Sequence, residues 1–101
     1  MPELPIVCLL SPDALRARRQ GLLSALLKRS AGHELLPDGL QLRFASSSGT
    51  LSSIAQAIEA ERHCCRFLRF TLTVEPDDGQ FVLELTGPHG TREFLAALLE
   101  M

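Results

Sequence analysis

The chain has 101 residues, of which 46% are hydrophobic and 22% are charged, with a formal net charge of −2. This length and hydrophobic content suffice for one folded core, so residues 1–101 are predicted to form a single domain. The small charge imbalance argues against nucleic acid as a partner, and the apolar run from Ile6 to Leu10 is too short to cross a membrane. Because the N-terminus also lacks the basic stretch of a secretory signal, we expect a cytoplasmic protein.

The first half of the chain predicts a strand, a helix and another strand. Residues 5–10 form a continuously apolar run, which is typical of a strand covered on both faces, and we expect it at the centre of a sheet. Ser11 and Pro12 are typical of a helix start, and the leucines that follow at helical spacing predict a helix ending near Ser30. Alternation of apolar and polar residues over 40–44 predicts a half-buried strand.

The second half predicts a helix, a β-hairpin and a last helix. Alternating residues over 70–74 and 81–85 flank a Pro-Asp-Asp-Gly turn, which indicates the hairpin, and residues 94–99 carry the apolar stripe of the last helix. The middle helix contains Glu61 on its inward stripe, whose apolar members follow helical spacing. These members are Leu51, Ile54, Ala55, Ile58 and Cys65.

These elements predict an α/β fold of the α+β type, in the order β-α-β-α-β-β-α. Because the strands with alternating patterns bury only one face, we expect a two-layer sandwich: a four-stranded mixed sheet with the helices on one face. The other face would remain open. We expect a homodimer to form through this open face.

The most distinctive chemistry lies in the segment Glu61-Arg62-His63-Cys64-Cys65. Adjacent residues on a helix point about 100° apart, so the two thiols converge only if the helix loosens at its end. A helix C-terminus also disfavours a thiolate, which nearby arginines would offset.

A third cysteine, Cys8, lies on the predicted central strand, against which the helix of Cys64 and Cys65 is expected to pack. Three thiolates select soft ions such as Hg(II), Cu(I), Zn(II) or As(III). The predicted metal site therefore contains Cys8, Cys64 and Cys65, with Glu61 or His63 as a further ligand.

Other interpretations of the same residues stay open. Cys8 and Cys65 are also consistent with small buried hydrophobes, in which case the chain is a non-catalytic interaction module. A strained disulfide between Cys64 and Cys65 would instead indicate a thiol redox protein. Glu61 could be a metal ligand, a proton acceptor for a neighbouring thiol, a salt-bridge partner or a residue at the helix edge. None of the common phosphate-loop, dinucleotide, nucleophile-elbow or zinc-protease motifs is present, which favours a role other than catalysis.

The segment from Glu61 to Phe70 resembles a group of small uncharacterised prokaryotic proteins with a Glu-x-x-Cys-Cys-Pro-Phe-Phe/Leu-x-Phe motif. Similar segments occur near the C-terminus of some MerR-like regulators. The resemblance covers nearly the whole chain and implies a link to metals, with Cys8 matching a first-strand cysteine. The main departure is Arg66, which stands where proline is usual and would let the helix run further.

Overall fold

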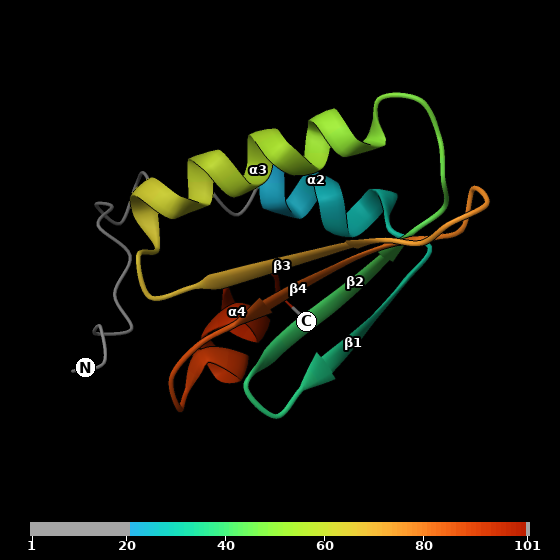
Figure 1. Cartoon of the computed structure of the whole chain (residues 1–101). Coiled ribbons are helices and arrows are strands. Elements are labelled where there is room, and N and C mark those ends of the chain that lie inside the picture. The colour runs from blue at the N-terminus through green and yellow to red at the C-terminus, as the bar shows by residue number, and fades with distance from the viewer. Residues whose placement is uncertain (1–20, 101) are drawn as a thin grey trace.

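The computed structural model describes residues 21–100, apart from the side chain of Cys64. In this range the chain has an α+β fold with three helices and one four-stranded sheet (Figure 1). The predicted strand at residues 5–10 and the helix start at Ser11 and Pro12 lie outside the described residues. The elements are α2 (Leu22–Arg29), β1 (Gly32–Leu36), β2 (Gly39–Phe44), α3 (Thr50–Cys64), β3 (Arg69–Val74), β4 (Phe81–Thr86) and α4 (Thr91–Leu98).

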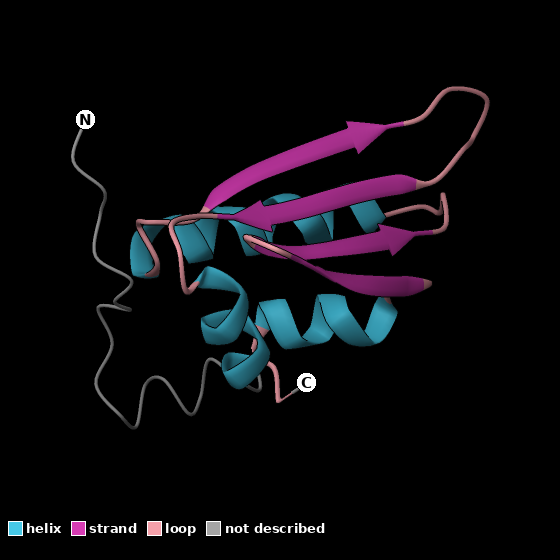
Figure 2. Cartoon of the chain, turned by 90° about the horizontal axis from the view of Figure 1, so that it is seen from below, coloured by secondary structure: helices cyan, strands magenta, loops and turns pink. Residues whose placement is uncertain are grey.

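The four described strands lie side by side in the order β1-β2-β4-β3, and every pair is antiparallel (Figure 2). The prediction of a mixed sheet is therefore wrong for these strands. The predicted element order also differs, because the described order is α-β-β-α-β-β-α and β1 was not expected. A two-residue turn at Pro37 and Asp38 folds β1 back onto β2, with Leu36 opposite Gly39.

Gly39 is required where β2 begins. A Cβ at this position would lie 1.8 Å from the carbonyl oxygen of Leu85 in the neighbouring strand β4. Only a residue without a side chain lets the two backbones approach this closely. The same end of the sheet is closed by a hydrogen bond from the Gly87 amide to the Asp38 carbonyl oxygen, at 3.1 Å.

The hydrophobic core lies between one face of the sheet and the helices. Alternate residues of the central strands are buried on this face: Leu40, Leu42, Phe44, Phe81, Leu83 and Leu85. Buried leucines of α2 and α4 and Ile54 of α3 belong to the same cluster. The residues between them, which include Gln41 and Glu84, point to the other face. The fold therefore has one apolar sheet face and one polar face.

The inward face of α3 differs from the predicted stripe. Ile54, Ala57 and Glu61 are buried at spacings of three and four residues, whereas Leu51 is 40% exposed and Ala55 is exposed. The helix is thus rotated about its axis relative to the prediction, and Glu61 stays on the inward side. No helix within residues 21–100 is both long enough and apolar enough to cross a membrane.

Candidate functional site

Helix α3 ends inside the cysteine pair. Its last residue is Cys64, and Cys65 has a non-helical backbone with φ −118° and ψ 78°. The Cys65 amide still donates to the Glu61 carbonyl oxygen at 2.7 Å, and the Leu68 amide then donates to the Cys65 carbonyl oxygen at 3.2 Å. The chain therefore leaves the helix at Cys65 and turns toward β3. Because Cys65 is not helical, the angle of about 100° between adjacent helical side chains does not apply to the Cys64–Cys65 pair.

Burial of Phe67 accounts for the end of the helix at Cys64. The Phe67 side chain is only 6% exposed, and its ring packs edge to face on Phe94 with centroids 5.2 Å apart. A Cβ on Gly87 would lie 3.2 Å from the Phe67 carbonyl oxygen and 3.3 Å from its ring. A continuing helix would carry Phe67 out of this contact. Tertiary packing of Phe67 thus determines where α3 ends.

Glu61 and Cys65 form the buried side of the site. Glu61 is 2% exposed and Cys65 is 1% exposed, and neither lacks an interaction partner. A buried carboxylate lowers the stability of a fold by several kcal/mol unless it is paired or protonated. The buried Glu61 carboxyl therefore needs an interaction partner. Its burial excludes the interpretation of Glu61 as a residue at the helix edge.

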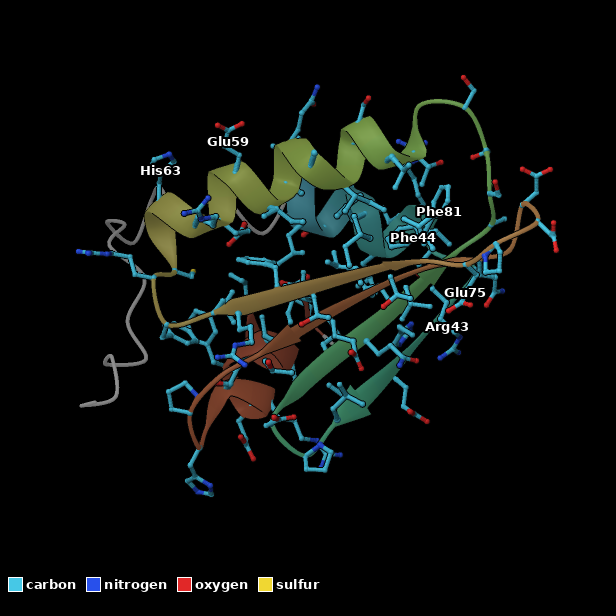
Figure 3. All side chains as sticks on the ribbon, in the orientation of Figure 1. Arg43, Phe44, Glu59, His63, Glu75 and Phe81 are labelled. Atoms are coloured by element: carbon cyan, nitrogen blue, oxygen red, sulfur yellow. The ribbon has the colours of Figure 1, made fainter. Side chains whose placement is uncertain are left out.

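His63 lies on a different side of α3 from this pair. In Figure 3, His63 and Glu59 project away from the sheet, and both side chains are exposed. Together with Arg62 they line a hollow of about 260 Å³ on the outer surface of the helix. The structure therefore does not bring His63 together with Glu61 and Cys65.

Basic side chains surround the end of α3. Arg62 and His63 lie in its last turn, and Arg66 and Arg69 are exposed in the segment that follows. Positive charge at a helix C-terminus is favourable because it opposes the partial negative charge of the last carbonyl groups.

The described residues supply only part of the predicted thiol site. Among the side chains described in residues 21–100, which do not include that of Cys64, no group of three or more His, Cys, Asp or Glu lies close enough to hold a metal ion. The structure describes Glu61 and Cys65, whereas Cys8 and the Cys64 side chain lie outside its described part. The Cys65 side chain is buried.

A polar network on the polar face of the sheet was not among the predicted site residues. The Arg43 guanidinium donates to Gln41 Oε1 at 2.9 Å, and Gln41 Nε2 donates to Glu84 Oε2 at 3.4 Å. Gln41 and Glu84 are directly opposite each other on β2 and β4. The alternation of polar residues in both strands was the available signal for this network.

Comparison with known proteins gives no match to any family model, to any curated protein or to any solved structure. The resemblance to the Cys-Cys motif group therefore stays a prediction from the residues alone.

Proposed function

We propose that this protein binds a soft metal ion, such as Hg(II), Cu(I) or Zn(II), through Cys64 and Cys65, with Cys8 and Glu61 as further ligands. The observation that carries the proposal is the end of α3 at Cys64, which places the second cysteine of the pair in a non-helical backbone. A regular helix would hold adjacent side chains about 100° apart.

The surroundings of the pair support thiolate chemistry. Binding of a metal requires thiols to lose their protons, and the exposed Arg62, Arg66 and Arg69 supply positive charge near this helix end. Glu61, buried one turn before Cys65, contributes a carboxylate that could bind the ion or accept a proton. Burial of Cys65 gives less support to a redox role, because reactive thiols are partly exposed. We propose a cytoplasmic location, where reducing conditions keep cysteines as thiols.

Native mass spectrometry of the reduced full chain tests the proposal. We expect one Hg(II), Cu(I) or Zn(II) ion per chain, and loss of that ion in the Cys64→Ser/Cys65→Ser double variant. His63→Ala is the matched control and should bind the ion normally, because His63 lies on the outer surface of α3. Unchanged stoichiometry in the double variant would refute the proposal.

The second candidate function is that of an interaction module that forms a homodimer through the open face of its two-layer sandwich. The observation that favours it is the Arg43, Gln41 and Glu84 network, which forms a polar platform with charges of both signs. Two copies related by a two-fold axis could place Arg43 of one copy near Glu84 of the other.

A charge reversal tests the dimer. If the open face is the interface, Arg43→Glu should shift the monomer–dimer equilibrium toward monomer, as measured by light scattering across a concentration series. Arg92→Glu, on an exposed position of α4, is the control that should leave the equilibrium unchanged. A monomer at all concentrations, or a dimer unaffected by Arg43→Glu, would reject this candidate.

A further inference from the structure

Strand β1 is an edge of the described sheet. It pairs with β2 on one side, and within residues 21–100 no strand pairs with its other side. In an antiparallel pair, alternate backbone N–H and C=O groups of an edge strand point outward and can accept a further strand. The outer edge of β1 therefore has backbone N–H and C=O groups that can form hydrogen bonds with a further strand.

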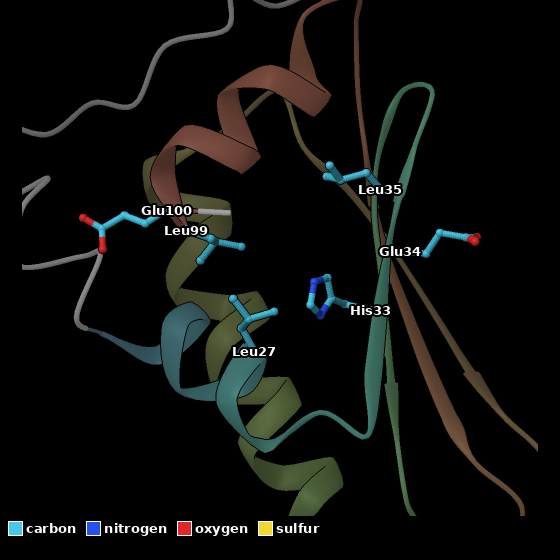
Figure 4. A pocket seen from close by; sticks show the side chains of 6 residues that line it. All are labelled: Leu27, His33, Glu34, Leu35, Leu99 and Glu100. Atoms are coloured by element: carbon cyan, nitrogen blue, oxygen red, sulfur yellow. The ribbon is translucent and has the colours of Figure 1, made fainter.

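An apolar hollow lies directly beside this edge, on the helix side of the sheet. Its volume is about 520 Å³, and it is lined by Leu27, His33, Glu34, Leu35, Leu99 and Glu100. Figure 4 shows Leu27 of α2, Leu99 after α4, and His33 and Leu35 of β1 pointing toward one another across it. Glu34 and Glu100, on opposite sides of the hollow, both point away from it.

We propose that β1 and this hollow bind an extended peptide segment of a partner protein, which adds as a strand and carries an apolar–basic–apolar sequence. Residues of an added strand opposite His33 and Leu35 would point to the helix side and enter the hollow. The residue between them would lie opposite Glu34 on the open face, where a Lys or Arg forms a favourable cross-strand pair. This site is independent of the cysteine pair.

The charge of Glu34 favours such a peptide over a second copy of the chain. Two β1 strands paired about a two-fold axis at Glu34 would place the two carboxylates directly opposite each other. Like charges in this position are destabilising. A basic residue in a different partner removes that repulsion.

The probe is a random octapeptide library displayed on phage and selected against the full chain. We expect enrichment of peptides with an apolar–Lys/Arg–apolar core. A synthetic copy of the enriched peptide should shift the amide NMR signals of His33, Glu34 and Leu35. Absence of a consensus, or shifts confined to β3 at the other edge, would overturn the proposal.

Charge reversal at Glu34 gives the sharper test, because this side chain is exposed. Glu34→Lys should lower the affinity for the basic peptide by about fivefold, and a peptide with Glu at the central position should bind this variant with the original affinity. Leu35→Asp, which puts a charge into the hollow, should lower the affinity for both peptides by about tenfold or more.

Val74→Asp, at an exposed apolar position on β3, is the matched control and should leave peptide affinity unchanged. Equal binding by all variants would overturn the proposal. So would a concentration-dependent dimer with which the peptide competes, since the second copy would then be the occupant.

Discussion

Replacement of Phe67 by alanine tests how the turn after α3 is held. The Phe67 ring is 6% exposed and meets the Phe94 ring edge to face at 5.2 Å, with 84° between the ring planes. Loss of a buried aromatic ring, together with its ring pair, should lower the free energy of unfolding by about 3–4 kcal/mol. That is a large share of the roughly 5–15 kcal/mol that stabilises a typical domain.

Urea denaturation followed by far-UV circular dichroism measures this change, because the chain has no Trp or Tyr to serve as a fluorescent probe. Leu72→Ala is the control: Leu72 is 39% exposed on β3, so its truncation should cost about 1 kcal/mol or less. If Phe67→Ala costs no more than Leu72→Ala, packing of Phe67 is not what holds the turn.

Three further substitutions test the local geometry by the same denaturation assay. Gly39→Ala should destabilise the fold by about 3 kcal/mol or more, since the new Cβ would overlap the Leu85 carbonyl oxygen, and a milder effect would mean that β2 and β4 separate easily. Gly49→Ala, at φ 83° with open space around it, should lower the free energy of unfolding by only about 1–2 kcal/mol. A loss equal to that of Gly39→Ala would mean that the space around each glycine does not decide the cost. Thr91→Val should cost about 1 kcal/mol by removing the hydroxyl that donates to the Pro88 carbonyl oxygen at 2.6 Å, and no change would show that this bond contributes nothing.

The hairpin of β3 and β4 was predictable because its signals are local. Alternating residues flank a Pro-Asp-Asp-Gly turn, and the structure pairs Leu72 with Leu83 as that pattern requires. Strand β1 was not predicted, because Leu35 and Leu36 are adjacent and interrupt the alternation. Its existence depends on pairing with β2 through a two-residue turn.

The candidate site was predictable only in part. Helical spacing correctly indicated that Glu61 and Cys65 face inward, and both are almost fully buried. The end of the helix at Cys64 could not be predicted from Arg66, which is compatible with a longer helix. It depends on burial of Phe67 against Phe94 and beside Gly87, residues that are distant in sequence.

X-ray absorption at the zinc K-edge, on reduced protein loaded with one Zn(II), tests the proposed metal site most directly. Thiolate ligands give a sulfur shell at about 2.3 Å, whereas nitrogen and oxygen ligands lie at about 2.0–2.2 Å. We expect at least two sulfur ligands in the native chain and their loss in the Cys64→Ser/Cys65→Ser variant. A shell of nitrogen and oxygen alone, or a sulfur shell unchanged in that variant, would contradict the proposal.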